Sequence, residues 1–496
     1  MNEEQNELQS ELIVGLVGAV GTELSQVVDL LTERIKLAGY EVRRIKVSDE
    51  VIPIFNSEKV TPADPLDRID LLMRAGNRAR ENAKDNSILA LGVADAIYQQ
   101  RPKGKSEKDK GKSIPASRTA FIIDSLKRPE EVTALRNIYP SGFILIGVHS
   151  EESRRLTHLT KNLGISVENA KDLIERDGEE RQVPYGQRLN RTFHLADFFV
   201  RITENRERLR HDIKRMVEIW FGNPFTTPTF DEFAMFMAFS AALRSADLSR
   251  QVGAVIAKDY RILSTGANDC PMFNGGLYWP ERDETFAISD VAGGRDYTIG
   301  YDSNRVEQNR IIEEIVSQCS EKGIDPGVVK KILQDSRVAD LTEFGRVVHA
   351  EMEAILACGR SGVSTVNATL YSTTFPCHNC AKHIVAAGLT RAVYVEPYPK
   401  SKAIEFHKDS ITTDPEGDRS SKVRFVPFVG IGPRRYFDLF SMNTGASYPL
   451  VRKDPITGAA STWSIDRAKL RIKMLPDSYL GLELEAVEKF RNNLKE

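Results

Sequence analysis

The pattern of apolar and polar positions predicts an α/β fold in the first part of the chain. The run at 12–23 begins as a buried strand, passes into a glycine-rich turn and leads into a helix that continues to about Leu37. Three later runs, at 121–124, 142–148 and 195–200, predict further strands. Buried strands that alternate with helices are typical of a parallel sheet. We therefore expect an N-terminal domain built on a parallel sheet.

The second part of the chain has the pattern of a mixed sheet flanked by helices. A helical stretch precedes two apolar runs separated by a turn, which predict a β-hairpin, and helical and strand-like stretches then alternate. The expected strands are 252–257, 261–266, 368–372, 392–396 and 423–429, and the expected helices are 233–248, 347–358, 376–388 and 401–408. This order predicts an α/β/α arrangement around a mixed five-stranded sheet.

A break in the pattern marks the expected domain boundary. A long amphipathic helix ends at 220–221, and a proline turn at 223–224 follows it. We therefore expect one domain over 1–222 and a second over 223–496. About 80 residues separate the hairpin from the next predicted helix, so the second domain is expected to carry an insert at 270–345, which shapes the mouth of its pocket.

Composition and charge narrow the class of protein. The 496 residues are 41% hydrophobic and 28% charged, which is enough apolar material for two or three packed cores. Lysine and arginine number 68 against 70 acidic residues, so no strong positive field is available to bind a nucleic-acid backbone. Residues 1–11 are polar, and no apolar run approaches the length of a membrane span. With five cysteines, we expect a cytoplasmic protein that does not bind a membrane.

Two short motifs in the second domain carry the most specific chemistry. One reads His349-Ala350-Glu351 and the other Pro376-Cys377-His378-Asn379-Cys380. The imidazole of His349 and the thiolates of Cys377 and Cys380 supply three ligands for Zn2+ and leave one coordination position for water. Zinc lowers the pKa of such a water, and Glu351 is the carboxylate expected to carry its proton. The motifs are also predicted to lie near helix N-termini, which stabilise thiolates.

The spacing H-x-E followed by P-C-x-x-C is the signature of zinc-dependent nucleobase deaminases. The alternatives are a structural zinc knuckle or a redox pair, with His349 as an ordinary buried histidine. A knuckle normally brings four protein ligands, whereas the chain has one C-x-x-C and its other cysteines are isolated. Neither alternative explains Glu351, so the pattern favours a catalytic site.

Here the chain resembles the deoxycytidylate deaminase family. The resemblance lies in the run from Ala242 to Val255, in Thr265-Gly266-Ala267-Asn268 and in the two motifs, and it extends over roughly 230–430. It implies deamination at C4 of a deoxycytidine nucleotide, with zinc on the histidine and the two cysteines and with Glu351 moving protons. It further implies that Asn268 contacts the sugar. The alternative for Asn268 is a turn residue selected for its backbone hydrogen bonds.

Two adjacent arginines follow the last predicted strand. Arg434 and Arg435 lie beside a turn in the run from Gly430 to Phe437. Guanidinium groups match phosphate oxygens in geometry, so we predict that these arginines contact the phosphates of the substrate. An ion pair at the surface is an equally good explanation of either residue.

The first strand and its turn have the layout of a phosphate-binding loop, with Gly15, Gly18, Gly21 and Thr22 as the expected nucleotide-binding residues. Together with the later strands, region 12–222 resembles P-loop nucleotide-kinase-like domains. The loop lacks the lysine of G-x-x-x-x-G-K-[ST]. A degenerate nucleotide fold that senses or scaffolds is therefore favoured over kinase activity, although backbone N–H groups still suit phosphate.

A kinase-like domain ahead of a deoxycytidylate-deaminase-like domain is similar to the bacterial antiphage dCTP deaminases. That resemblance implies conversion of dCTP, and often of dCMP, to the uracil nucleotide, which drains a DNA precursor during phage infection. It also implies restraint by a small RNA or protein inhibitor, and enzymes of this kind commonly form homo-oligomers. The alternatives are a nucleotide kinase-deaminase of ordinary pyrimidine metabolism and a nucleic-acid editing deaminase, which needs a basic groove.

Overall fold

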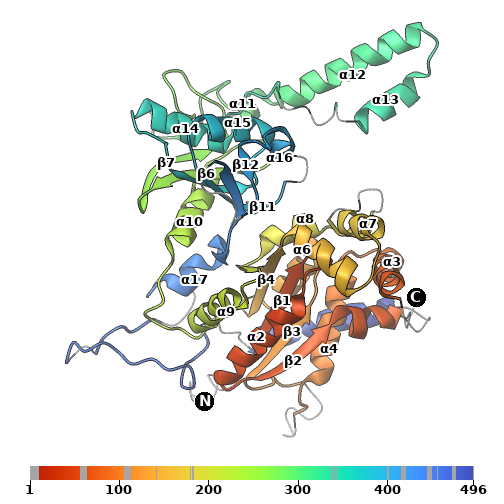
Figure 1. Cartoon of the computed structure of the whole chain (residues 1–496), viewed down its shortest axis with the longest axis vertical. Coiled ribbons are helices and arrows are strands. Elements are labelled where there is room, and N and C mark those ends of the chain that lie inside the picture. The colour runs from red at the N-terminus through yellow and green to blue at the C-terminus, as the bar shows by residue number, and fades with distance from the viewer. Residues whose placement is uncertain are drawn as a thin grey trace. The chain divides into compact units, whose positions relative to one another are not determined.

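The fold was analysed in a computed structural model, which divides into two compact units (Figure 1). Unit 1 comprises Met1–Glu232 and Phe428–Glu496, and unit 2 comprises Phe233–Pro427. The structure describes residues 11–55, 64–104, 113–140, 142–178, 180, 184–336, 338, 341, 343–398, 401–414, 421–443, 449–454, 456–471 and 476–494. Within these ranges, every helix is too short or too polar to span a lipid bilayer.

Unit 1 contains the parallel sheet that the sequence predicts. Its strands are β1 (Leu12–Gly18), β2 (Glu41–Lys46), β3 (Thr119–Asp124), β4 (Phe143–Ser150), β5 (Phe198–Ile202) and β14 (Gly430–Ile431). They are ordered β14-β5-β4-β1-β3-β2, and every pair is parallel except β14 with β5. The sheet is therefore of mixed type, with one short antiparallel strand at its edge.

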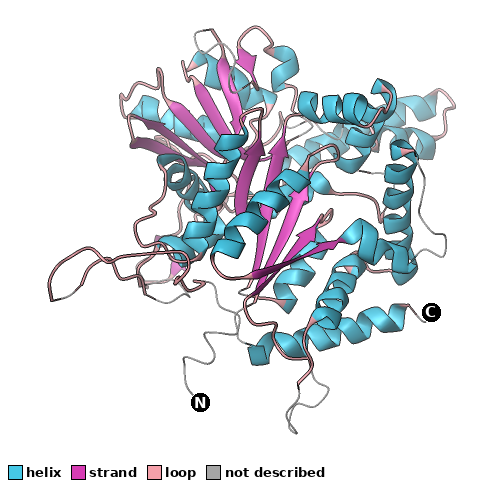
Figure 2. Cartoon of the chain, turned by 60° about the horizontal axis from the view of Figure 1, so that its bottom comes forward, coloured by secondary structure: helices cyan, strands magenta, loops and turns pink. Residues whose placement is uncertain are grey.

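Helices cover this sheet (Figure 2). They are α2 (Leu24–Leu37), α3 (Pro65–Ala83), α4 (Ile88–Gln100), α5 (Pro129–Ile138), α6 (Glu152–Thr157), α7 (Val167–Gly178), α8 (Leu189–Thr192), α9 (Arg206–Trp220), α17 (Tyr436–Phe440) and α18 (Pro476–Asn493), with short 3-10 or π turns at 47–51, 52–55, 158–162, 193–195 and 433–435. The predicted helix that ends near Leu37 is thus confirmed as α2.

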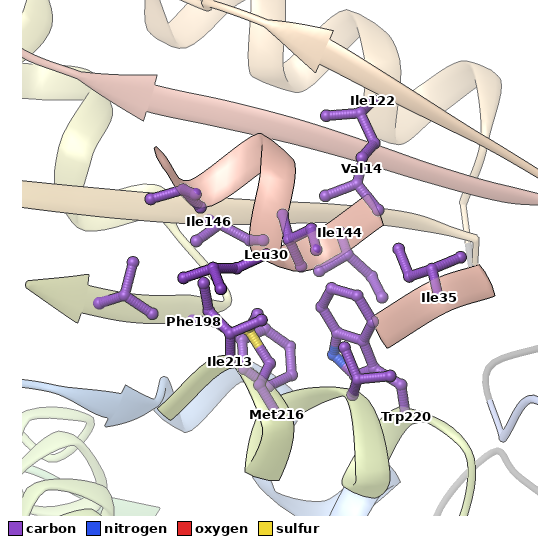
Figure 3. Packing of buried hydrophobic residues seen from close by; sticks show 14 of the residues in the cluster. Val14, Leu30, Ile35, Ile122, Ile144, Ile146, Phe198, Ile213, Met216 and Trp220 are labelled. Atoms are coloured by element: carbon purple, nitrogen blue, oxygen red, sulfur yellow. The ribbon is translucent and has the colours of Figure 1, made fainter. Parts of the chain in front are cut away.

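Two helices and four strands enclose the main core of unit 1. Alternate residues of β1 point to the same side of the sheet, where they meet the apolar faces of α2 and α9. Figure 3 shows Leu30 and Ile35 of α2 and Ile213, Met216 and Trp220 of α9 packed against Val14, Ile122, Ile144 and Ile146 of the strands. Burial of one such aliphatic side chain stabilises the folded state by about 1.5–3 kcal/mol relative to its exposure to water.

The division into units differs from the predicted domains 1–222 and 223–496. The last part of the chain, from Phe428, returns to unit 1: β14 adds an edge strand beside β5, and α18 packs against α4. The boundary predicted at 222–223 lies close to the point where the chain leaves unit 1, but the sequence did not indicate that residues 428–496 belong to unit 1.

Unit 2 is built on a mixed sheet of six strands, one more than predicted. The strands are β6 (Gly253–Lys258), β7 (Arg261–Ala267), β10 (Thr369–Thr374), β11 (Arg391–Glu396), β12 (Ile411–Thr412) and β13 (Val423–Pro427), in the order β12-β13-β11-β10-β6-β7. β6 is antiparallel to both neighbours, and the other pairs are parallel. The additional strand is β12, whose two residues are too few to show a period of two.

The helices of unit 2 are α10 (Phe230–Ala242), which begins within unit 1, α11 (Asp296–Ile299), α12 (Ser303–Glu321), α13 (Pro326–Gln334), α14 (Ala350–Arg360), α15 (His378–Ala386) and α16 (Ala403–Phe406). The predicted insert contains α11, the paired helices α12 and α13 (Figure 1), and a small hairpin of β8 (Glu281–Arg282) and β9 (Ile288–Ser289). Residues 337, 339–340 and 342 of the predicted insert lie outside the described residues.

Candidate active site

The two sequence motifs stand at the first turns of neighbouring helices in unit 2. His349 is the residue before α14, and Cys377 is the residue before α15, which follows β10. Cys377 also caps its helix, because its sulfur accepts a hydrogen bond from the backbone N–H of Cys380 at 3.4 Å. The positive end of each helix dipole faces these side chains and favours anionic sulfur.

The predicted ligand atoms lie together. Nδ1 of His349 is 3.3 Å from Sγ of Cys377 and 3.3 Å from Sγ of Cys380, and all three atoms lie within 4.8 Å of one another. In a tetrahedral zinc site with bonds of about 2.0–2.3 Å, neighbouring ligand atoms are about 3.6–3.8 Å apart. The spacing and the set of one nitrogen and two sulfurs therefore fit zinc. Among the described residues, this is the one group of three that could hold a metal ion.

Contacts within the cluster shift its pKa values in opposite directions. The hydrogen bond from Cys380 is the main reason that the pKa of Cys377 falls to about 3; burial opposes this shift, and the hydrogen bond and charge of His349 lower the pKa further. The same hydrogen bond and burial raise the pKa of Cys380. The hydrogen bond to Cys377 raises the pKa of His349, against burial and the positive charge of Arg250. Because metal ions displace ligand protons, the affinity for zinc should fall as the pH falls.

Glu351 stands beside the three ligand atoms. It lies in the first turn of α14, is 4% exposed, and its Oε2 accepts a hydrogen bond from Sγ of Cys380 at 3.4 Å. Burial raises the pKa of this carboxyl, and the negative charge of Cys377 raises it further. A raised pKa makes the carboxylate a stronger proton acceptor than an ordinary glutamate, which suits a group that carries protons.

The side chain of Asn268 is engaged with the backbone. Asn268 is buried directly after β7, where its Oδ1 accepts a hydrogen bond from the N–H of Val252 at 2.6 Å and its Nδ2 donates to the carbonyl of Arg250 at 2.8 Å. These bonds correspond to the turn role that the sequence left open. Contact of Asn268 with the substrate sugar remains a prediction. In the structure, its side chain holds the loop at 250–252 through the two backbone hydrogen bonds.

The two C-terminal arginines do not lie in the unit that contains the cysteines. Arg434 is exposed and Arg435 is buried in unit 1, within the short turn at 433–435. Nη2 of Arg435 donates to the carbonyl of Phe143 at 2.8 Å, and its Nε lies 3.6 Å from the carboxylate of Asp197. The structure thus places these arginines in unit 1 next to β14, whereas the sequence analysis placed them in the second domain. Their contact with the phosphates of the substrate remains a prediction.

The glycines of the N-terminal loop have different roles. Gly15 and Gly18 lie within β1, and a Cβ added to Gly15 would come within 2.8 Å of the ring of Phe143, so Gly15 allows close packing. Gly21 has φ +81 in the turn that follows, a conformation that favours glycine. Thr22 comes directly after it, and its N–H donates to the carbonyl of Ala19 at 2.9 Å.

A carboxylate of unit 1 faces this loop. The N–H of Val20 donates to Oδ2 of the buried Asp177 at 2.7 Å. Lys127 lies between them, with Nζ 2.9 Å from the carbonyl of Gly18 and 2.8 Å from Oδ1 of Asp177. The carboxylate of Asp177 thus already accepts a hydrogen bond from one N–H of the loop. Binding of a nucleotide phosphate at Gly15, Gly18, Gly21 and Thr22 remains a prediction.

Comparison with known proteins identifies the class of enzyme. Residues 228–396 match the cytidine and deoxycytidylate deaminase zinc-binding region. The deoxycytidylate deaminase of Enterobacteria phage T2 is 33% identical over 166 residues, which are 34% of this chain and 79% of that protein. The phage T4 enzyme of the same name is 31% identical over 166 residues, covering 34% and 77%. The deoxycytidylate deaminase of Saccharomyces cerevisiae is 24% identical over 270 residues, which are 52% of this chain and 68% of that protein.

The chain is therefore a hydrolytic deaminase with zinc as its cofactor. It belongs to the cytidine and deoxycytidylate deaminase family, and the matched residues lie almost entirely in unit 2.

Proposed function

We propose that the protein hydrolyses the amino group of deoxycytidine nucleotides, converting dCMP to dUMP and dCTP to dUTP. One observation carries the proposal: His349, Cys377 and Cys380 place an imidazole nitrogen and two sulfurs within 4.8 Å, and the carboxyl of Glu351 lies 3.4 Å from one of these sulfurs. The names of the relatives, deoxycytidylate deaminases of phages T2 and T4, support the choice of nucleotide.

Glu351 performs the proton transfers of the proposed reaction. When bound by His349, Cys377 and Cys380, zinc supplies the Lewis acidity that lowers the pKa of a water molecule. Glu351 takes a proton from the attacking water and delivers it to N3 of cytosine while the new C–O bond forms at C4. It then carries the remaining hydroxyl proton to the exocyclic amine, the C4–N bond breaks, and ammonia leaves. Burial of Glu351 excludes bulk water from these transfers.

For unit 1 we propose a P-loop nucleotide-kinase-like domain that binds a nucleotide and regulates unit 2. The parallel strand order β2-β3-β1-β4-β5 and the glycine turn at the end of β1 support this proposal. The absence of a lysine in the turn sequence favours regulation over phosphate transfer.

The proposed biological role is depletion of dCTP in the cytoplasm during phage infection, by a homo-oligomer restrained by a small RNA or protein. This role rests on the resemblance of the two-part chain to bacterial antiphage dCTP deaminases. A drop in the dCTP pool of expressing cells on infection is expected; an equal drop without infection favours ordinary pyrimidine metabolism.

A panel of substrates tests the proposed reaction. Zinc-loaded protein is incubated with dCMP, with dCTP, with single-stranded DNA and with dCMP plus ATP, and ammonia, uracil products and phosphate transfer are measured. We expect ammonia and uracil nucleotides from the free nucleotides and no phosphate transfer. Deamination confined to DNA would favour an editing enzyme, transfer from ATP would favour a kinase, and no product in any arm would refute the proposal.

A further inference from the structure

The glycine turn of unit 1, residues 18–22, lies at a switch point of the sheet. β1 is followed by β2, which lies on one side beyond β3, whereas β3 is followed by β4, which lies on the other side of β1. Ligands of open α/β sheets bind where neighbouring strands are connected in opposite directions, at the carboxyl ends of the strands. The loop after β3 contains Lys127, whose Nζ lies 2.9 Å from the carbonyl of Gly18. A lysine from another loop therefore contacts the turn that has none of its own.

A second cationic side chain also contacts the turn. Nη1 of Arg155 in α6 lies 3.4 Å from the carbonyl of Val20, and its Nε lies 3.2 Å from the carbonyl of Ser150. A Cβ added to Gly21 would come within 2.9 Å of the carbonyl of Arg155, so glycine lets the turn and α6 pack closely. In the part of unit 1 that the structure describes, no carboxylate lies within ion-pair distance of Arg155. Its charge is therefore available to an anion.

The carboxylate that now occupies the turn lies in an unfavourable place. Asp177 is fully buried in the last turn of α7, where the negative end of the helix dipole disfavours a further negative charge. It is held there by the N–H of Val20 at 2.7 Å and by Nζ of Lys127 at 2.8 and 3.1 Å. These are the kinds of contact that a phosphate oxygen makes at a glycine turn. Because residues that oppose local stability are expected at functional sites, the position of Asp177 indicates a function.

Asp177 is able to leave the turn without opening the main core of unit 1. Ala170 and Leu173 of α7 pack with Leu159 and Ile165 in a small cluster that is separate from the core beneath α2 and α9. Local opening of such a peripheral cluster costs less free energy than global unfolding. The last turn of α7 can therefore withdraw from the glycine turn while the sheet stays intact.

Lys127, in contrast, is fixed at the turn. The N–H of Leu126 donates to the carbonyl of Leu16 in β1 at 2.9 Å, and the N–H of Lys127 donates to Oε2 of Glu131 at 2.8 Å. The side chain of Lys127 is 22% exposed, so a ligand reaches it from solvent. When Asp177 withdraws, the ammonium group stays beside the turn without its partner.

We propose that the carboxylate of Asp177 occupies the phosphate site of the glycine turn and that a nucleoside triphosphate binds by displacing it. Lys127 then pairs with the phosphates instead of the carboxylate and supplies the charge that the turn sequence lacks, and Arg155 adds a second charge. The inference rests on the proposed binding of a nucleotide by unit 1. Because displacement of Asp177 costs free energy, the site fills only at a higher nucleotide concentration, which suits a sensor.

Calorimetric titration of the full chain with ATP and Mg²⁺ tests the displacement, since ATP has no cytosine for unit 2 to deaminate. In Asp177→Asn the amide still accepts the N–H of Val20 but has no charge, and we expect Kd to fall about 10- to 100-fold, the usual size of coupling between two contacts. Asp177→Ala, which also frees this N–H, should bind at least as tightly. Inorganic tripolyphosphate should show the same gain, because the displaced contact is with phosphate.

Asp172→Asn is the matched control. Asp172 is an exposed residue of the same helix, so the substitution removes the same charge without touching the turn. We expect Kd for ATP to equal that of wild type. A cooperative thermal transition shows that each variant is folded.

A second comparison tests the role of Lys127. Lys127→Ala is made in the Asp177→Asn chain, so that no buried carboxylate is left without its partner. We expect Kd to rise about 10- to 100-fold relative to Asp177→Asn alone, the usual loss for a charged hydrogen bond. Lys171→Ala, at an exposed position of α7, is the control in the same chain and should leave Kd unchanged.

The outcomes separate the inference from the proposed role of unit 1. Binding that is detected in Asp177→Asn and is weaker or undetected in wild type supports the displacement. A wild type that binds ATP with the same Kd as Asp177→Asn and Asp177→Ala refutes the displacement alone. Folded variants that bind neither ATP nor tripolyphosphate refute nucleotide binding by unit 1 as well.

Discussion

At the scale of single residues, the site separates metal binding from proton transfer. The three ligand atoms of His349, Cys377 and Cys380 face one another, and the carboxyl of Glu351 lies beside them at 3.4 Å from one sulfur. Its burial and the neighbouring sulfur both raise the pKa of the carboxyl. Substitution of a ligand and substitution of Glu351 should therefore have different effects.

Substitutions of Cys377, which is half-buried, and of Cys358, which is buried, form a matched pair of variants that tests the metal site. Cys377→Ala removes a predicted ligand, so we expect zinc to bind more than about 100-fold more weakly, since even lost outer-shell contacts cost about 10- to 100-fold. Cys358 is also in unit 2, but its sulfur hydrogen-bonds the hydroxyl of Ser264 at 3.2 Å. Cys358→Ala should keep wild-type zinc affinity. Equal affinities of the two variants, measured by chelator competition, would contradict the ligand assignment.

The predictable residues are those whose role is set by local spacing. The spacing within the two motifs indicated His349, Cys377 and Cys380 as one set of ligands, and in the structure these residues lie together at the N-termini of α14 and α15. The partners of Asn268 and Arg435 are backbone groups fixed by the tertiary fold, at Val252 and Phe143, and no spacing indicates them.

At the scale of elements, the site depends on helices that pack directly on the hairpin of β6 and β7. A Cβ added to Gly253 would come within 1.9 Å of the carbonyl of Ala238 in α10, and one added to Gly266 within 2.1 Å of the carbonyl of Ala350 in α14. Gly253 and Gly266 point to opposite faces of the hairpin, since Gly253 pairs with Ala267. Glycine at both positions lets the helices approach the strands closely.

Gly266→Ala should therefore disturb the start of α14, where His349 and Glu351 lie. We expect a loss of at least about 1–3 kcal/mol of stability from overpacking, together with weaker zinc binding. Gly359→Ala is the control in the same helix, because no atom outside the helix lies within 4 Å of an added Cβ there. That substitution should stabilise by about 0.5–1 kcal/mol. Thermal unfolding measures both; unchanged stability in Gly266→Ala would contradict the close packing.

In unit 2, the long strands and the helices that follow the two motifs were predicted, whereas β12 and the helices of the insert were not. The five long strands of unit 2 and the helices at 350–360 and 378–386 follow from apolar spacing. The strand β12 has two residues, and α13 has no buried residue, so neither gives the pattern of an element packed on a core. The predicted helix at 233–248 is shorter in the structure and ends at Ala242.

At the scale of the whole molecule, buried charges join the C-terminal residues to unit 1. Arg101 donates to Glu11 at 2.8–2.9 Å and also pairs with Glu483 of α18. The hydroxyl of Tyr479, also in α18, donates to Glu11 at 2.7 Å. These residues are far apart in sequence and have no pattern that links them, so the return of the chain to the first sheet was not predictable from local composition.

The rate of ammonia release from dCMP by Glu351→Gln, with zinc content measured on the same sample, tests the central claim most directly. Glutamine keeps the size of the side chain but cannot carry a proton, so we predict zinc content equal to wild type and a kcat lower by about 10²- to 10⁴-fold. A variant that keeps its zinc and retains wild-type kcat would contradict the account.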